Sequence, residues 1–497
     1  MKKLQKLLNG LKTIEVRGNT DISIKDIQYD SRKCSKNSLF VAIPGTISDG
    51  HKYFGSCYRA GTRAFICEYF PEEIYEGSVF IKVANSRHSL AELSHLWYDR
   101  PSDYMKVIGV TGTNGKTTIT YIIKALLESM GLKVGIIGTT GILIGNTKLP
   151  ATHTTPESLE LCGHLDKMRS EHVSHVIMEV SSHALHQGRV RGVSFDAAIF
   201  TNLTHEHLDY HKSMEEYAGA KKILFEMLRE DGIAIVNGDS EFAEFMLDDI
   251  MPNKKIMIGR NPENHIVIMN EMLGLRSTEY VLDLKQVSEY SQQLIPLRTQ
   301  LMGRFNIDNT AMAAALAYLL GMEKLKLQQA LSSADGAPGR MQRINLKNGA
   351  IGIVDYAHTP DALDKALLSC RNVLNNSGKK DRKLICVFGC GGNRDRSKRP
   401  VMGKSAAKLA DRVIICNDNP RAEDPELIIF EIFNGISKKK QSIVTMIPDR
   451  AKAIAKAAEI SSHDDIILVA GKGHEDYQII GEERIHFDDT EELLKFS

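Results

Sequence analysis

The stretch Gly109-Val110-Thr111-Gly112-Thr113-Asn114-Gly115-Lys116-Thr117-Thr118 lies between an apolar run, 106–110, and a segment of helical periodicity, 118–130. Glycines at such a strand-to-helix turn let backbone N–H groups surround phosphate oxygens, and the helix dipole favours the negative charge. Lys116 is placed to reach the β- and γ-phosphates, and the Thr117 hydroxyl is placed to bind Mg²⁺. The common motif has a glycine where this chain has Val110, so a glycine-rich turn without a ligand remains the alternative. The sequence predicts an ATP-binding loop of Gly112, Thr113, Asn114, Gly115, Lys116, Thr117 and Thr118.

The regions around this loop predict an α/β fold. Apolar runs bounded by Gly, Asn and Asp alternate with segments of helical periodicity, as in mostly parallel sheets. Between 266 and 301 the pattern changes to short alternating runs, which favours an antiparallel insertion. Buried-type strands return at 352–358, 383–390, 412–418, 442–447 and 465–471 and indicate a second doubly wound sheet. We therefore expect three domains, a small α/β domain (1–102), a central P-loop ATPase domain (103–336) and a C-terminal Rossmann-like domain (337–497).

Composition excludes several classes of protein. The 497 residues include 63 Lys and Arg against 62 Asp and Glu, so no overall basic field exists to hold a nucleic acid or an anionic membrane. The longest apolar stretch, 311–320, is shorter than the ~18 residues that a membrane span needs. The eight cysteines form no Cys-x-x-Cys pair, which fits reduced thiols in a cytoplasmic protein. We expect small-molecule substrates and neither nucleic acid nor membrane insertion.

Acidic and histidine residues follow two later strands. Glu179 lies at the end of the apolar run 173–180, one residue before its last, and the segment 201–211 contains His205, His207 and His211 with two acids. The carboxyl ends of parallel strands meet at one edge of a sheet, so both groups should lie near the phosphate loop. Such a cluster suits Mg²⁺ beside ATP, and zinc remains the alternative because imidazoles bind it well.

Lys221 lies on a helix expected at 215–228, whose apolar side is defined by Ala220, Leu224 and Phe225. From the residues alone, a lysine that extends into solvent is favoured.

Nine motifs occur along the chain in the order seen in the Mur ligases of bacterial cell-wall synthesis, a family that this sequence resembles over nearly its whole length. Individually some are weak, but together they are highly specific, and the family also carries the TGTNGK form of the phosphate loop. Two positions depart from the family pattern, Asn393 where many relatives have Asp and Gly188 where they have a bulkier residue. The motifs are TGTNGKTT (111–118), MEVSSHAL (178–185), TNLTHEHLDYH (201–211), LMGRFNIDN (301–309), APGRM (337–341), DYAHTPDAL (355–363), GCGGNRDRSKRP (389–400), DNPR (418–421) and GKGHEDYQ (471–478).

The resemblance implies roles for particular residues. It implies catalytic roles for Lys116, Lys221 and His207, and it implies that Lys221 is carbamylated, which provides two oxygens for Mg²⁺ beside Thr117, Glu179 and His207. It implies UDP-muramoyl-peptide contacts from Ser31, Thr154, Thr155, Ser181, Gln187 and Arg189, and adenosine contacts from Asn306, Asn309, Arg340 and Asp355. It implies diaminopimelate contacts from Arg394, Asp418, Asn419, Pro420, Arg421, Gly471 and Glu475.

Within the family, the motif set is most similar to the ligases that add meso-diaminopimelate to UDP-N-acetylmuramoyl-L-alanyl-D-glutamate. We therefore expect an ADP-forming amide-bond ligase that uses ATP and Mg²⁺ and proceeds through an acyl phosphate. The alternatives are a ligase of the same family that adds L-lysine, a folylpolyglutamate synthetase-like ligase and a regulatory ATP-binding module. The ~100 residues before the phosphate loop argue against the folylpolyglutamate enzyme, which needs no uridine-binding domain. The Asp418-Asn419-Pro420-Arg421 segment favours diaminopimelate, because a planar guanidinium suits its second carboxylate.

Overall fold

The computed structural model describes residues 1–497 except 46–47, 146, 152, 208–209, 251–254, 285, 288–293 and 377–380. Asp209, one of the two acids of the predicted histidine cluster, lies outside the described residues. The chain forms two compact units. Unit 1 comprises Met1–Lys116, Gly131–Val236 and Ser240–Ile256, and unit 2 comprises Thr117–Met130, Asn237–Asp239 and Met257–Ser497.

The first sheet of unit 1 has the strand order β2-β7-β6-β5-β4. β4 to β7 run parallel and β2 is an antiparallel edge. One face carries Phe65 stacked on Phe80 at 4.5 Å, and the other carries Leu39 and Ile66, so apolar side chains are buried on both sides. The strands are β2 (Thr13–Arg17), β4 (Asp26–Gln28), β5 (Ser38–Val41), β6 (Ala64–Cys67) and β7 (Val79–Val83), and β1 (Lys2–Lys3) pairs separately with β3 (Ser23–Ile24).

The second sheet of unit 1 holds the predicted phosphate loop. Those of its strands that belong to unit 1 lie in the order β11-β10-β9-β12-β8-β13-β14, with β8 between β12 and β13 and parallel to both. β9 follows β8 along the chain, but β12 lies between the two in the sheet, so this connection skips one strand. The strands are β8 (Lys106–Thr111), β9 (Val134–Gly138), β10 (Gly141–Ile144), β11 (Thr147–Leu149), β12 (His175–Glu179), β13 (Phe195–Phe200) and β14 (Leu228–Asn237).

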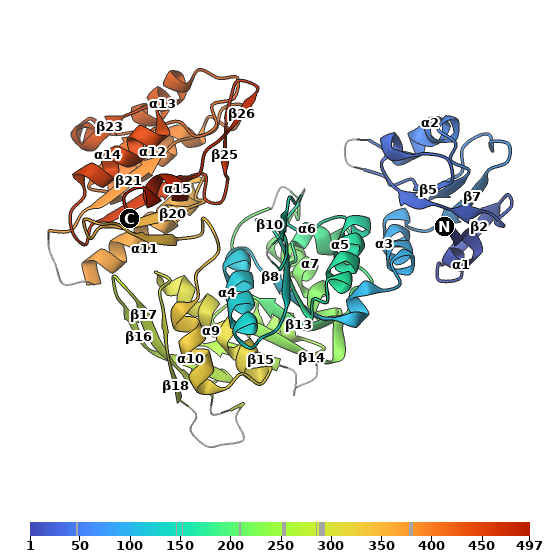
Figure 1. The fold of residues 1–497 in the computed structure, drawn as a ribbon, viewed down its shortest axis with the longest axis horizontal. Coiled ribbons are helices and arrows are strands. Elements are labelled where there is room, and N and C mark those ends of the chain that lie inside the picture. Colours follow the sequence, from blue (N-terminus) through green and yellow to red (C-terminus); the bar gives the residue numbers. More distant parts are fainter. Residues whose placement is uncertain are drawn as a thin grey trace. The chain divides into compact units, whose positions relative to one another are not determined.

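The helices of unit 1 cover these sheets (Figure 1). The Asn85 side chain caps α3 (Ser86–Trp97) by accepting a hydrogen bond from the His88 amide at 2.8 Å. The predicted helix 215–228 is α7, capped in the same way by Ser213. The helices are α1 (Leu4–Leu8), α2 (Phe54–Arg59), α3 (Ser86–Trp97), α5 (Ser158–Ser170), α6 (Ser182–His186), α7 (Met214–Glu226) and α8 (Ala243–Leu247), with short 3₁₀ turns at Ser31–Lys33, Gly50–Tyr53 and Pro101–Tyr104.

The first part of unit 2 contains the expected antiparallel strands. β16 pairs with β17, and β17 with β18, all antiparallel, and Tyr280 of β17 is buried with its hydroxyl 2.9 Å from Thr310 of α9. Alternate side chains of β17 and β18 are buried, as a sheet with one covered face requires. The elements are α4 (Lys116–Ser129), which begins two residues before the predicted helix, β15 (Lys255–Gly259), β16 (Ile266–Leu273), β17 (Thr278–Asp283), β18 (Leu294–Thr299), α9 (Arg304–Leu319) and α10 (Lys324–Ser333).

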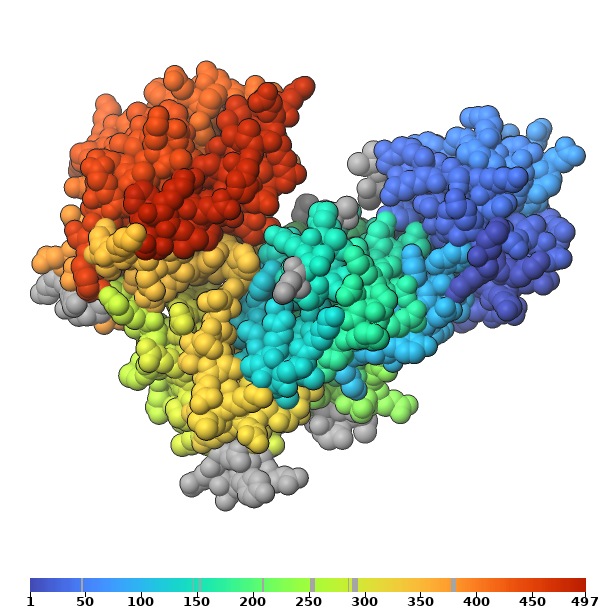
Figure 2. Space-filling view, in the orientation of Figure 1, coloured from blue at the N-terminus to red at the C-terminus, as the bar shows by residue number. Residues whose placement is uncertain are grey.

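The second part of unit 2 is the predicted doubly wound sheet, in the order β19-β20-β24-β21-β22-β23, with β20 to β23 parallel. Arg450 and Asp489 are both fully buried and form a bidentate ion pair, with Nε and Nη2 of Arg450 each 2.7 Å from a carboxylate oxygen of Asp489. In Figure 2 the side chains of this region, coloured orange to red, form a closely filled surface. The elements are β19 (Gln342–Asn345), β20 (Ile351–Asp355), α11 (Pro360–Asn376), β21 (Leu384–Phe388), α12 (Lys398–Leu409), β22 (Arg412–Ile415), α13 (Pro425–Asn434), a 3₁₀ turn (Lys438–Ile443), β23 (Val444–Met446), α14 (Arg450–Ile460), β24 (Ile466–Ala470), the hairpin β25 (Tyr477–Ile480) and β26 (Glu483–His486), and α15 (Asp489–Leu494).

The α/β class and the five late strands are confirmed, and the structure adds a hairpin, β25–β26, that periodicity did not indicate. None of the helices described is both long and apolar enough to cross a membrane.

Candidate active site

The predicted phosphate loop joins β8 to α4. Gly112 and Gly115 have φ angles of +142° and +90°, a backbone conformation that residues with a side chain rarely adopt. A Cβ on Gly112 would also lie 1.9 Å from the Thr201 hydroxyl oxygen. The Asn114 amide donates to the Asn202 side chain at 3.0 Å, so the segment after β13 holds the loop. Lys116 Nζ donates to the carbonyls of Gly112 and Thr113, at 2.9 Å each. The lysine is therefore folded over the loop whose phosphates it is predicted to bind.

Glu179 is the last residue of β12 and is only 1% exposed. Its register partner on β8 is Val110, so its carboxylate lies at the sheet edge where the phosphate loop begins. Oε1 accepts from the Thr139 amide at 2.9 Å and Oε2 from the Thr139 hydroxyl at 3.1 Å. A Cβ on Gly138 would lie 2.3 Å from Oε1, so the small residue makes room for the acid. Sequence reasoning missed Thr139, although it follows β9 at this same edge.

The histidine segment after β13 divides into an exposed and a buried part. His205 and His207 are exposed, and His207 has a φ of +58° with its ring 4.9 Å from that of His183. His211 is 3% exposed, and its Nε2 lies 2.9 Å from the Ser182 hydroxyl. Burial first, and then neighbouring histidines and Lys221, lower the pKa of His211 to about 4.

Lys221 is buried, with only 1% of its surface exposed. The prediction from the residues alone, that its side chain extends into solvent, is therefore wrong. Its ammonium lies 4.4 Å from the centre of the Tyr217 ring, one turn earlier on α7. The Tyr217 hydroxyl lies 3.3 Å from that of Thr113 in the phosphate loop. Burial first, and then the charge of Lys116, hold the pKa of Lys221 well below its usual range. Tyr217, which sequence reasoning also missed, thus connects this lysine to the loop.

Five of the six predicted muramoyl-peptide residues form one network beside Glu179. The Thr155 hydroxyl donates to the Glu179 carbonyl at 2.9 Å and accepts from the Ser181 amide at 3.0 Å. Arg189 donates to Gln187 Oε1 at 2.7 Å and to the Thr155 carbonyl at 3.2 Å. Thr154 joins through the Thr139 hydroxyl at 3.1 Å.

Ser31, the sixth of these residues, belongs to the first sheet of unit 1. It begins the 3₁₀ turn after β4 and is half-buried, and Asp30 caps that turn by accepting from the Arg32 amide at 3.0 Å.

The predicted adenosine residues belong to unit 2. Asn306 and Asn309 are buried on α9 and joined by a 3.0 Å hydrogen bond. Asp355 ends β20 and accepts from the amides of Met341 and Ala357 at 2.8 and 2.9 Å. The Arg340 guanidinium lies 5.0 Å from the Tyr356 ring, and its buried Nε has no hydrogen-bond partner among the described residues.

The predicted amino-acid residues also lie in unit 2, on loops after β21, β22 and β24. Asn419 Nδ2 donates to Glu475 Oε2 at 3.0 Å, and a Cβ on Gly471 would lie 2.7 Å from Asp418 Oδ2. Pro420 and Arg421 follow directly, and Arg421 Nη1 donates to the Gly392 carbonyl at 2.8 Å.

Arg394, in the loop after β21, is exposed. Its Cγ and Arg421 Nη1 would both lie within 4 Å of a Cβ on Gly391. The structure therefore brings both arginines to one glycine turn. Sequence reasoning missed Lys472, whose ammonium lies 3.2 Å from Glu475 Oε2.

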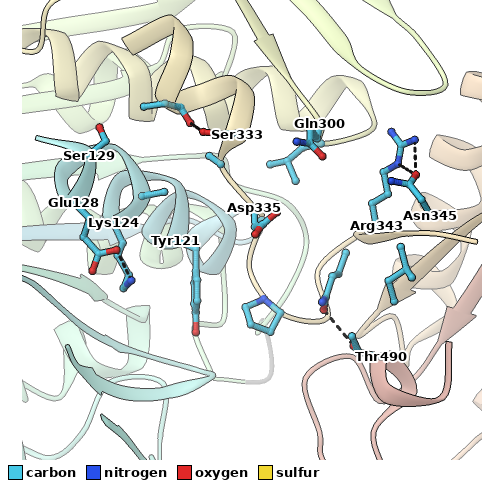
Figure 3. A pocket seen from close by; sticks show the side chains of 18 of the residues that line it. Tyr121, Lys124, Glu128, Ser129, Gln300, Ser333, Asp335, Arg343, Asn345 and Thr490 are labelled. Atoms are coloured by element: carbon cyan, nitrogen blue, oxygen red, sulfur yellow. Dashed lines mark hydrogen bonds and ion pairs between the residues drawn. The ribbon is translucent and has the colours of Figure 1, made fainter. Parts of the chain in front are cut away.

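A cavity of about 780 Å³ lies elsewhere in unit 2 (Figure 3). Lys124 and Glu128 of α4 form an ion pair of 2.6 Å beside it, and Arg343 donates to Asn345 Oδ1 at 3.1 and 2.9 Å. Of the described residues that line it, none belongs to the predicted site.

The whole chain is similar to known ligases. Residues 110–317 match the Mur ligase middle domain, 339–473 the Mur ligase glutamate ligase domain and 23–98 the Mur ligase family catalytic domain. Enzymes named UDP-N-acetylmuramoyl-L-alanyl-D-glutamate–2,6-diaminopimelate ligase are 42% identical in Clostridium botulinum, over 95% of each chain, and 39% identical in Clostridioides difficile, over 98% of each.

Solved structures agree with these relatives. A structure of a ligase of that same name is 31% identical, with a TM-score of 0.71 over 99% of this chain and 98% of the other. A Mycobacterium tuberculosis folylpolyglutamate synthase, 15% identical with a TM-score of 0.58 over 78% of this chain and 92% of the other, shares the fold alone. The protein belongs to the Mur ligase family.

Proposed function

We propose that this protein joins meso-diaminopimelate to UDP-N-acetylmuramoyl-L-alanyl-D-glutamate in peptidoglycan precursor synthesis. Mur ligases are ATP-dependent enzymes that form amide bonds, so the reaction class follows from the family. The choice of amino acid is carried by relatives of about 40% identity over the full chain, which are named for 2,6-diaminopimelate. Arg394 and Arg421 at one glycine turn support it, because diaminopimelate has one more carboxylate than lysine.

The proposed chemistry activates a poor electrophile. An oxygen of the D-glutamate side-chain carboxylate attacks the γ-phosphorus of ATP, ADP leaves, and an acyl phosphate results. The deprotonated amino group of diaminopimelate then attacks the acyl carbon, the carbon–oxygen bond breaks, and phosphate leaves as the amide forms. Lys116, already folded over the loop, is the residue of this chain that stabilises the charge on the transferred group.

We propose that Thr117, Glu179, His207 and a carbamylated Lys221 hold Mg²⁺. When bound, Mg²⁺ would neutralise charge on the phosphates and the acyl group. The residues fit a hard cation, because the buried Glu179 carboxylate lies at the loop edge.

The environment of Lys221 supports its modification. Burial first, and then the charge of Lys116, lower the pKa of Lys221, which favours the uncharged amine, the form that reacts with CO₂. The carbamate is an anion, so the repulsion between Lys221 and Lys116 becomes an attraction.

The remaining predicted sets complete the proposal. The network around Thr155 and Arg189 would bind the muramoyl peptide, Ser31 the uridine nucleotide, and Asn306, Asn309, Arg340 and Asp355 the adenosine. The unpaired Nε of Arg340 supports a ligand there, because a buried donor without a partner is costly. We place the enzyme in the cytoplasm, where ATP is available and where its eight free thiols would stay reduced.

The test is the release of phosphate from ATP with the UDP-linked dipeptide and each candidate amino acid. We expect release to require the dipeptide and to be far faster with meso-diaminopimelate than with L-lysine. Equal rates, or a preference for lysine, would overturn the choice of amino acid. Release without the UDP-linked dipeptide would overturn the ligase assignment.

A further inference from the structure

We infer that Lys472 is a positioning residue that sets the charge and geometry of the amino-acid site through Asn419 and Glu475. The inference deepens the proposed function and rests on it. Lys472 is not among the residues that the motif comparison assigned to the substrate.

Lys472 is a fully buried cation with two polar contacts. Its side chain is 0% exposed, and Nζ lies 3.2 Å from Glu475 Oε2 and 3.4 Å from Asn419 Oδ1. Asn419 Nδ2 donates to the same Oε2 at 3.0 Å, which closes a triangle of three side chains. The Ile479 amide donates to Asn419 Oδ1 at 2.9 Å and fixes the amide orientation from the other side.

The backbone delivers Lys472 into this position. Its neighbours Gly471 and Gly473 have φ angles of +120° and +53°, so the chain turns on both sides of the lysine. A Cβ on Gly473 would lie 2.6 Å from Cβ of Tyr356, which leaves no room for a side chain there. The loop is therefore shaped to place one long side chain inward.

The contacts of Glu475 described above are all made by Oε2, so Oε1 can accept a hydrogen bond from a substrate ammonium. Lys472 also neutralises the carboxylate, so the pair carries no net charge. The distal end of meso-diaminopimelate has an ammonium and a carboxylate and is likewise neutral overall. The distal end of lysine carries one positive charge and would gain more from an unneutralised Glu475. Lys472 therefore favours diaminopimelate over lysine.

The first test is Lys472→Met, which keeps an unbranched side chain of nearly the same length and removes its charge. We expect KM for meso-diaminopimelate to rise roughly tenfold or more, since breaking a buried charged contact has effects of that size. The ratio of kcat/KM for diaminopimelate to that for lysine should fall, while KM for ATP and for the UDP-linked dipeptide should change less than about twofold. Lys456→Met is the matched control, because Lys456 pairs with Glu459 three residues later, at 3.0 Å, on an exposed helix face.

The second test is Glu475→Gln, alone and combined with Lys472→Met. Alone it leaves Lys472 unneutralised, so the preference for diaminopimelate over lysine should increase. In the double variant, Lys472→Met should add less than about threefold to KM, because its partner is already neutral. Additive effects, or an unchanged preference in Glu475→Gln, would overturn the role of Lys472, and this second variant decides the matter if Lys472→Met does not fold. Failure of the unmodified protein to add diaminopimelate would instead refute the proposed function.

Discussion

The ammonium of Lys221 lies 4.4 Å from the centre of the Tyr217 ring, and the Tyr217 hydroxyl lies 3.3 Å from that of Thr113. Lys221 and Tyr217 are four residues apart on α7, so they share one face of the helix. That face is directed into unit 1, where both side chains are 1% exposed. A buried lysine so close to a phosphate loop needs a reason, because a paired or exposed lysine is far less costly.

We predict that Lys221 carries a carbamate in the active enzyme. Intact-mass or crystallographic examination under CO₂ should show the added mass, and Lys221→Ala should lose most of the activity because the oxygens disappear. Small carboxylates such as formate or acetate should restore part of it by occupying the vacated space. The control is Lys222→Ala. The ammonium of Lys222 lies 3.5 Å from the carboxylate of the exposed residue Asp249. Normal turnover by Lys221→Ala would show that the assignment of a metal ligand is wrong.

We predict an acyl-phosphate intermediate. One ADP and one phosphate should form per amide bond, and hydroxylamine should trap the activated carboxylate as a hydroxamate before diaminopimelate is added. Lys116→Ala should reduce hydroxamate formation by about two orders of magnitude or more, because Lys116 is the cation over the loop. Release of AMP and pyrophosphate would contradict the mechanism.

We predict that His95 makes unit 1 less stable in mild acid. His95 is 2% exposed, and burial first, and then Arg100, lower its pKa from 6.5 to about 4. Between pH 6.5 and about 4, His95 therefore binds a proton in the unfolded chain but not in the folded chain. Stability should fall as pH falls from 6.5 to about 4, by at most about 1.4 kcal/mol per pH unit.

The midpoints of urea unfolding at pH 4.5 and 7.5 check this prediction. Unfolding is monitored by the fluorescence of Trp97, the one tryptophan of the chain, which lies two residues after His95 on α3. His95→Gln should reduce the difference between the two midpoints. His463→Gln, an exposed histidine of unit 2, should leave it unchanged. An equal pH dependence in all three proteins would contradict the assignment.

The sheet edge of this site was predictable, because it depends on topology. Glu179 ends β12 and Asn202 follows β13, the two strands that flank β8, and the carboxyl ends of parallel strands meet at one edge. The strand order was not predictable in the same way. β9 follows β8 along the chain, yet β12 lies between them, since the pairing depends on contacts that periodicity does not describe.

The environment of single side chains was the least predictable feature. Periodicity placed Lys221 beside an apolar helix face but did not reveal that it lies against the Tyr217 ring, whose hydroxyl contacts Thr113 of the phosphate loop. Lys472 was visible within a motif, but its inward path depends on two positive φ angles at the flanking glycines. Such contacts arise from loop geometry and from residues that are distant in the sequence.

The last prediction concerns Arg421, which we expect to bind the distal carboxylate of diaminopimelate. Its φ of +54° is unusual for an arginine, and its backbone is held on both sides, by N–H donation to the Ile479 carbonyl at 3.1 Å and by the Gly481 amide at 2.8 Å. Its Nη1 donates to the Gly392 carbonyl at 2.8 Å, which positions the guanidinium at the turn shared with Arg394. A side chain held this way can present its planar fork without further ordering.

Arg421→Ala should therefore raise KM for meso-diaminopimelate. It should also narrow the gap in kcat/KM between meso-diaminopimelate and lysine by roughly two decades, because the second carboxylate loses its charged partner in a half-buried site. Arg421→Lys should recover only part of the loss, because an ammonium cannot make two parallel hydrogen bonds to a carboxylate. Arg412→Ala is the control, since Arg412 is an exposed residue of β22 outside the site. The kinetic parameters for the two amino acids decide the matter: if Arg421→Ala lowers both kcat/KM values equally, Arg421 supports the loop and does not read the second carboxylate.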